Sequence, residues 1–302
     1  MLSKANPEPT TRTVRRIKIP WTPILFLLPY LVVFLLFRFG PTVAGVLVSF
    51  TNWKVIGTPE WAGMGNYRAL FGDPLFLVAL KNTVAFLLMA APATVVLGLM
   101  LALLLNKKLF GRAIARTVIF APYAVMFTVA GIIWNWMYDS NFGLINQTLE
   151  SWGLGKVPWL TSEQFALMAI AIVMVWWLTG YAMVLFLAGL QDIPEELYEA
   201  ASIDGASSLQ KFRWVTLPLL APTTFIVVML VVINVFQIFD LVYVMTNGGP
   251  GTSTLTLVHY MYVSAFSQLK LGYGSAIAVV VFVILTALAF VQTRFLRQEV
   301  NA

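Results

Sequence analysis

The sequence has no cysteine and a single histidine among its 302 residues. Without cysteine, disulfides, thiolate-bound metals and thiol nucleophiles are excluded. The lone histidine, His259, cannot build a multi-histidine metal site. The G-x-x-x-x-G-K-[ST], G-x-S-x-G and H-E-x-x-H motifs are also missing. The chain therefore does not bind ATP through a P-loop and carries neither of the hydrolase signatures that the other two motifs represent.

Charge is scarce as well. Only 11% of the residues are charged and 60% are hydrophobic, whereas about 25% are charged in an ordinary soluble domain. This composition indicates an integral membrane protein. The net charge of +6 could suggest a nucleic-acid partner. The basic residues flank apolar segments, however, which favours a role in orienting the chain in a bilayer.

Six apolar runs are each long enough for a hydrocarbon core of about 30 Å, and helices are the form that satisfies the backbone in lipid. The sequence thus predicts an all-α polytopic membrane protein with about six transmembrane helices. A basic tail (residues 1–20) precedes the transmembrane region (residues 21–297), and a short tail (298–302) follows it. The first run is long and shows no small-residue cleavage site, which favours a retained anchor over a signal peptide. The predicted spans are Ile24–Ser49, Thr83–Leu105, Val118–Met137, Phe165–Leu190, Leu219–Met245 and Gly274–Val291.

Lysine and arginine are distributed unequally between the two sides of these spans. With the N-terminus inside, the inner segments hold thirteen basic residues and the outer segments five. The positive-inside rule therefore predicts that both termini and the segment 191–218 are cytoplasmic. Arg38 lies within the first apolar run. A side chain that reaches toward the outer face and a functional charge are both compatible with that position.

The segment 191–218 holds five of the thirteen acidic residues although apolar runs flank it. Its pattern predicts two short helices joined by a corner. Asp192 with Glu195 fits a capping box, and Ser207 with Gln210 fits another. Gly205 is placed to end the first helix with a positive φ, and Pro218 is expected to end the second helix. We call this segment the elbow.

Glu199-Ala200-Ala201, Gly205 and Val215-Thr216-Leu217-Pro218 follow each other at fixed spacing. This pattern resembles the EAA loop of permeases in the ABC importer class, with Val215 where isoleucine is commoner. Shorter motifs extend the resemblance to the first of the two permease subunits of maltose-type sugar importers. They are Ser49-Phe50-Thr51-Asn52-Trp53, Phe239-Asp240-Leu241 and Asn247-Gly248-Gly249-Pro250.

The resemblance implies a non-catalytic subunit in a bacterial cell membrane. It implies a second homologous permease, two cytoplasmic ATPase subunits and an extracytoplasmic solute-binding protein as partners. ATP and Mg²⁺ would be bound by the ATPase subunits, with no cofactor in this chain. The elbow residues that would contact an ATPase are Glu199, Ala200, Ala201, Asp204, Gly205, Leu217 and Pro218.

Polar and aromatic groups within the spans suggest a solute path. Trp177 and Tyr181 share a helix face at i, i+4 spacing, and Asn234, Gln237 and Asp240 lie toward one side of the fifth span. Aromatic planes suit the C–H faces of a sugar, and amides suit its hydroxyl groups. Helix packing explains the same residues equally well. The resemblance favours the path, because maltose-type permeases bind sugar with these two helices.

The sequence therefore predicts a permease subunit of an ATP-driven importer for a carbohydrate or sugar-like solute. A glycerophospho-compound or a polyol is the alternative solute. A channel or scaffold would not need the elbow, and a membrane enzyme would need the clustered acid, base or metal residues that the spans lack.

Overall fold

The computed structural model describes residues 21–107 and 109–300, with side chains for residues 25–107 and 109–294. The predicted N-terminal tail and the last two residues of the predicted C-terminal tail lie outside this range. The described residues form helices, with a single isolated β-bridge between Thr51 and Trp61. The predicted all-α class is confirmed.

Two compact units divide the chain, one ending at Ala44 and one beginning at Gly45. The first contains α1 (Trp21–Phe34), the π-helical turn η1 (Leu35–Phe39) and the start of α2 (Gly40–Val48). Arg38 lies in that π turn, and its carbonyl accepts a hydrogen bond from the Thr42 hydroxyl at 2.7 Å.

The second unit begins with the rest of α2 and contains all the later elements. Among these, η2 is a 3₁₀ turn, and η3 and η4 are π turns. In chain order they are α3 (Gly65–Phe71), α4 (Pro74–Asn106), α5 (Arg112–Phe120), η2 (Ala121–Ala124), α6 (Phe127–Met137), α7 (Leu144–Ser151), α8 (Ala166–Gln191), α9 (Glu195–Ile203), α10 (Ser208–Lys211), η3 (Phe212–Thr216), α11 (Leu217–Phe236), α12 (Asp240–Met245), α13 (Leu257–Tyr262), η4 (Val263–Ser267) and α14 (Leu271–Val300).

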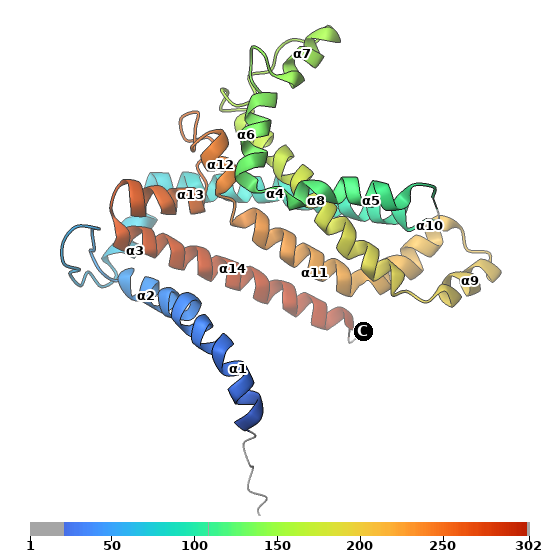
Figure 1. The fold of residues 1–302 in the computed structure, drawn as a ribbon, viewed down its shortest axis with the longest axis horizontal. Helices are drawn as coiled ribbons and strands as arrows, with labels where there is room; N and C mark the ends of the chain where they lie inside the picture. The colour runs from blue at the N-terminus through green and yellow to red at the C-terminus, as the bar shows by residue number, and fades with distance from the viewer. Residues whose placement is uncertain (1–20, 108, 301–302) are drawn as a thin grey trace, which may run out of the picture. The chain divides into compact units, whose positions relative to one another are not determined.

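Within this unit α11 packs against α4, α8 and α14, and α4 packs along α8 (Figure 1). The elbow elements α9 and α10 lie at one end of these long helices, and α3 and α13 lie toward the other end (Figure 1). A chain that crosses a bilayer six times places alternate connections on opposite sides. The two ends of the bundle are therefore the natural membrane faces.

Five stretches of the described chain are long and apolar enough to span a membrane. A sixth span is present if α5–η2 and α6 count as one, although they meet at 99°. The predicted spans are thus found, but the expectation of an unbroken helix over Val118–Met137 is wrong. Pro122 lacks an N–H and sits in the 3₁₀ turn, and Val125 leaves the helix with extended φ and ψ of −84° and 136°.

The fifth predicted span, Leu219–Met245, is also interrupted. α11 ends at Phe236 and α12 begins at Asp240, so the residues between them leave the regular helical hydrogen-bond pattern. Irregular backbone at membrane depth is tolerated where protein buries it or where it lines a cavity. At both interruptions the freed backbone groups must therefore either be buried by protein or line a cavity.

Pro218 does not end a helix, contrary to the prediction. The chain continues from α10 through the π turn η3 into α11, and Pro218 occupies the first turn of α11. A proline ring clashes with the carbonyl four residues earlier in a regular α-helix, and the wider π turn changes that geometry. The same arrangement occurs where η1 precedes Gly40 and Pro41. Pro92 and Pro222 lie inside α4 and α11.

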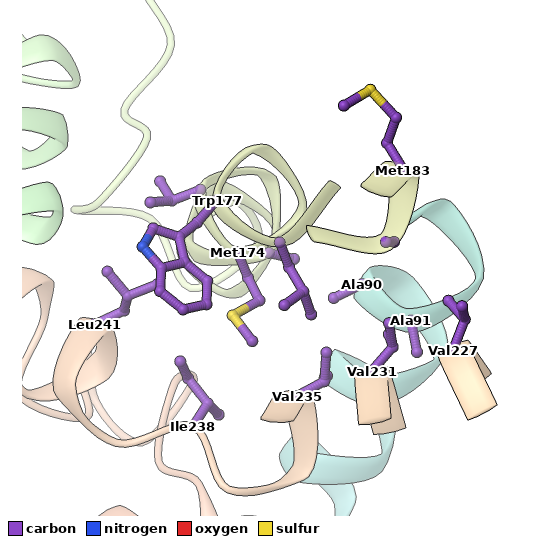
Figure 2. Packing of buried hydrophobic residues seen from close by; sticks show 14 of the residues in the cluster. Ala90, Ala91, Met174, Trp177, Met183, Val227, Val231, Val235, Ile238 and Leu241 are labelled. Carbon is purple, nitrogen blue, oxygen red and sulfur yellow. The ribbon is translucent and has the colours of Figure 1, made fainter. Parts of the chain in front are cut away.

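Small residues let the long helices approach each other closely. A Cβ atom added at Gly98 would lie 2.7 Å from the Cβ of Ala182, and one at Gly180 would lie 2.2 Å from the carbonyl oxygen of Ile119. One at Gly189 would lie 2.3 Å from the Oγ1 of Thr223. Contact of this kind is typical of helix packing in membranes. Figure 2 shows the core between these crossings, with alanines of α4 facing valines of α11.

Candidate functional site

The elbow is a helical corner at one end of the bundle. Gly205 follows α9 with φ +79°, as predicted, and a Cβ atom added there would meet nothing within 4 Å. The Ser207–Gln210 capping box is present, with Ser207 N–H donating to Gln210 Oε1 at 2.7 Å. The predicted Asp192–Glu195 capping box is wrong. Asp192 caps the C-terminus of α8, and α9 starts after Pro194 without a side-chain cap.

Hydrogen bonds tie the two arms of the elbow together. Tyr198 of α9 bonds the Thr216 hydroxyl at 3.0 Å, and Lys211 Nζ donates to Ser202 Oγ at 2.6 Å. Because Thr216 belongs to η3, which continues into α11, these hydrogen bonds connect α9 to a membrane span.

The elbow residues expected to contact an ATPase lie at the surface, except that Ala201 is half-buried. The exposed ones are Glu199, Ala200, Asp204, Gly205, Leu217 and Pro218. The structure adds apolar side chains that the motif does not include. Ile203 is 87% exposed, Leu209 74% and Trp214 71%. Of these, Leu209 and Trp214 lie within the stretch Ser208–Met245, which is long and apolar enough to span a membrane.

A cavity of about 470 Å³ lies at the break between η2 and α6. We call it the break cavity. Six consecutive residues of the break form part of its wall, α8 contributes Trp177, and the first residue of α12 contributes Asp240. Both interrupted spans therefore meet at this cavity. Its lining residues are Tyr123, Ala124, Val125, Met126, Phe127, Thr128, Trp177 and Asp240.

Four aromatic rings form a cluster at the break cavity. Tyr123 stacks on Tyr181, with ring centroids 4.6 Å apart and planes 12° apart, and Phe127 stacks on Trp177 at 3.9 Å. Tyr123 also contacts Trp177 at 4.5 Å. The indole N–H of Trp177 donates to the Val125 carbonyl at 2.9 Å, so the helix break gains a hydrogen-bond partner. Figure 2 shows the Trp177 ring pointing toward Leu241.

The five predicted path residues are only partly brought together. Trp177 and Asp240 line the break cavity, and Tyr181 joins it through its stacked partner Tyr123. Asn234 is half-buried and donates to the carbonyl of Leu230 in its own helix at 2.8 Å. Gln237 is exposed at the C-terminal end of α11. Neither Asn234 nor Gln237 belongs to the wall of this cavity.

Sequence reasoning missed Tyr123 and Phe127. The available signal was Pro122, a proline within a predicted span with aromatic residues on both sides of it. A proline inside an apolar run marks a possible break. Its aromatic neighbours are then positioned at irregular backbone, where a cavity can form.

Comparison with known proteins agrees with this architecture. Residues 94–301 match the family described as "Binding-protein-dependent transport system inner membrane component". The sulfoquinovosyl glycerol permease protein SmoG of Agrobacterium fabrum is 37% identical, with 91% of this chain and 90% of that protein covered. The trehalose/maltose permease protein MalF of Thermococcus litoralis is 36% identical, covering 88% of this chain and 90% of that protein.

Among solved structures, a bacterial alginate ABC transporter in complex with its alginate-bound periplasmic protein contains a chain with the same fold. The TM-score is 0.82 at 20% identity, with 92% of this chain and 94% of that chain covered. This likeness shows the same overall fold. The family match over residues 94–301 and the two relatives agree with the elbow and the interrupted spans. The chain therefore belongs to the family of inner membrane components of binding-protein-dependent transport systems and is a permease of the ABC class.

Proposed function

We propose that this permease carries a carbohydrate or sugar-like solute through the break cavity and couples that movement to ATP hydrolysis through the elbow. The observation that carries the proposal is the continuity of α8. This helix holds Trp177 and Tyr181 at the cavity and ends at Gln191, where the elbow begins. Ten residues of helix, about 15 Å, separate Tyr181 from that end.

The chemistry of the break cavity suits a sugar better than a glycerophospho-compound. Stacked aromatic rings offer flat apolar surfaces to the C–H faces of a pyranose. Asp240 offers a carboxylate as a hydrogen-bond acceptor for hydroxyl groups. A glycerophospho-compound would favour cationic side chains, and the wall of this cavity contributes none. Relatives named for trehalose/maltose and for sulfoquinovosyl glycerol transport support a sugar-like solute.

The mechanism follows from the two linked parts. Two cytoplasmic ATPase subunits would bind ATP and Mg²⁺ and close on each other, which moves the elbow and with it α8 and α11. A second permease would complete the path, and an extracytoplasmic solute-binding protein would deliver the solute. ATP shifts the equilibrium because it binds one state of the complex more tightly than the other. This chain contributes no catalytic residue to hydrolysis.

Removal of the Tyr123–Tyr181 stack is expected to slow uptake. In Tyr181→Ala and Tyr123→Ala we expect uptake to fall by about 2- to 10-fold, because an aromatic pair contributes about 0.5–1.5 kcal/mol beyond its buried area. Tyr181→Phe keeps the ring and should retain most of the uptake. Asn234→Ala should have a smaller effect, since that amide bonds its own helix. The measurement is uptake of labelled solute into cells or vesicles.

The matched control is Trp176→Ala. Trp176 is the residue before Trp177 on α8, is 39% exposed and contacts Trp134 outside the cluster. It should leave uptake and complex assembly unchanged. If Tyr181→Ala and Trp176→Ala impair uptake equally, or if Tyr181→Ala dissociates the complex, the cluster serves packing and the proposed path is wrong.

The proposed localisation is a bacterial inner membrane with both termini in the cytoplasm, on the basis of the unequal distribution of basic residues. Because the chain has no cysteine, single cysteines can be labelled without background. Ser208→Cys should react only with reagent added from the cytoplasmic side, and Thr252→Cys only with reagent added from outside. Thr252 is chosen because it is exposed, whereas the neighbouring Ser253 hydroxyl is buried. Labelling of Ser208→Cys from outside would show that the orientation is the reverse of the proposed one.

A further inference from the structure

A second cavity lies at the end of the bundle opposite the elbow. Its volume is about 340 Å³, and it shares no lining residue with the break cavity. Its walls come from a hairpin that follows α2, from α3, from the starts of α4 and α14, and from α13. We call it the hairpin cavity. Its lining residues are Asn52, Trp53, Lys54, Asn66, Ala69, Asp73, Tyr260, Lys270 and Tyr273.

The hairpin cavity is preformed, because hydrogen bonds join walls that are distant in sequence. The Asn66 amide donates to the Ser49 and Thr51 carbonyls, each at 2.8 Å. The Gly272 N–H donates to the Trp53 carbonyl at 3.0 Å. A Cβ atom added at Gly272 would lie 2.0 Å from the Thr51 carbonyl oxygen, so only glycine permits this approach. Preorganised walls reduce the cost of binding a ligand.

The single carboxylate in the wall is already hydrogen-bonded within the protein. Asp73 accepts hydrogen bonds from the hydroxyl groups of Tyr260 and Tyr273, the latter at 2.5 Å, and caps α4 through the Leu75 N–H at 2.9 Å. Burial acts to raise the pKa of Asp73, but these hydrogen bonds lower it overall. The pKa of Tyr260 is raised to about 12 by burial and by the bond to Asp73. Asp73 is therefore ionised and Tyr260 neutral at physiological pH.

The two lysines in the wall supply the free charge. In the part of the chain that the structure describes, the one ion pair within 4.0 Å joins Lys156 and Glu150. Neither Lys54 nor Lys270 therefore has a carboxylate oxygen of the described residues within 4.0 Å. Both lysines are exposed. Glu60 lies on the same hairpin but does not line the cavity. Two ammonium groups against one carboxylate leave the cavity with a net positive charge.

The remaining groups suit a sugar ring. Trp53 is half-buried, and its indole N–H donates to the Gly57 carbonyl at 3.2 Å, which fixes the ring in the wall. Asn66 uses its side-chain N–H groups within the protein, while its Oδ1 accepts no hydrogen bond from any described residue. Asn52 is exposed at the same wall. An aromatic plane with amide groups and a volume within the usual range of ligand sites matches one sugar unit.

We propose that the hairpin cavity binds a single sugar residue that carries an acidic group, such as a uronic acid. The acidic group pairs with Lys54 and Lys270, the ring lies on Trp53, and Asn52 and Asn66 bond its hydroxyl groups. The inference goes beyond the proposed function: it adds a site outside the break cavity, and the anionic preference belongs to this site alone, since the wall of the break cavity contributes no cation.

The test is equilibrium binding to the full chain purified in detergent, measured by calorimetry with D-glucuronate, D-glucose and acetate as probes. D-glucuronate should bind saturably and about tenfold more tightly than D-glucose, which lacks the acid, or acetate, which lacks the ring. The Lys54→Ala/Lys270→Ala double variant should weaken D-glucuronate binding about tenfold, since each exposed ion pair contributes only about 2- to 5-fold. Lys81→Ala, an exposed lysine of α4 outside the cavity, is the matched control and should bind normally.

Three results would overturn the proposal. The first is that folded protein shows no saturable binding of D-glucuronate. The second is that the double variant binds D-glucuronate as tightly as the wild type does. The third is that the wild type binds D-glucose as tightly as D-glucuronate. Loss of ATPase stimulation by the solute-binding protein in the double variant, with no D-glucuronate binding by the wild type, would assign the lysines to protein docking instead. Tyr181→Ala should leave binding at the hairpin cavity intact. Failure here is thus distinguishable from failure of the proposed path, which the uptake measurements test.

Discussion

Gly205→Val is expected to reduce solute uptake at least about tenfold while the protein still inserts and folds. Gly205 has φ +79°, and a left-handed conformation costs a β-branched residue roughly 1–2 kcal/mol or more. A Cβ atom would meet nothing within 4 Å, so the cost is conformational and not steric. Valine should therefore change the angle between α9 and α10. ATP hydrolysis should then become uncoupled from uptake, or the permease should no longer associate with its ATPase partner.

Two further variants separate coupling from general damage. Gly111 also has a left-handed φ, +75°, and open space where a Cβ atom would lie, but it precedes α5, outside the elbow. Gly111→Val carries the same backbone cost there and should retain uptake. Gly205→Asn should keep more activity than Gly205→Val, since asparagine tolerates this region. Wild-type uptake in Gly205→Val would remove the elbow from the coupling mechanism.

Gly180→Leu is expected to prevent stable folding of the membrane bundle. At Gly180 the backbone of α8 lies against the end of α5, so that an added Cβ atom would lie 2.2 Å from the Ile119 carbonyl oxygen and 2.7 Å from the Phe120 Cα. Backbone cannot move aside as a flexible side chain can, so the helices must separate. We expect a destabilisation at or above the upper end of the about 1–3 kcal/mol typical of overpacking. The yield and thermal midpoint of detergent-extracted protein measure it.

Gly45→Leu is the control for the Gly180 variant. Gly45 is also a helical glycine in an apolar segment, in α2, and a Cβ atom there would meet nothing within 4 Å. Its yield and thermal midpoint should remain close to those of the wild type. Equal stability of the two variants would contradict the close crossing of α8 and α5.

The elbow was largely predictable because its signals are local. A positive φ at Gly205 and the capping box of Ser207 with Gln210 depend on residues only a few positions apart. The two errors there have local causes too. Asp192 is the C-cap of α8, and a π turn before Pro218 allowed the helix to continue. Neither the C-cap at Asp192 nor the π turn before Pro218 can be predicted from composition or hydrophobic periodicity.

The break cavity was only partly predictable because it is assembled from segments that are far apart in the chain. Spacing placed Trp177 and Tyr181 on one face, but nothing in the sequence paired Tyr181 with Tyr123. Asn234 was also expected at the path; its amide donates to the Leu230 carbonyl of its own helix, and it does not line the break cavity.

The membrane class, the number and approximate limits of the spans, and the elbow with its glycine corner could all be predicted from the sequence. Those features follow from hydrophobic length, charge distribution and short-range backbone preferences, which act within a single segment. The three-dimensional packing was needed to establish where the spans break, which aromatic rings meet, and that Lys54 and Lys270 share a cavity with Asp73. These depend on contacts across some fifty to two hundred residues, where close packing selects one arrangement among many that share the same pattern.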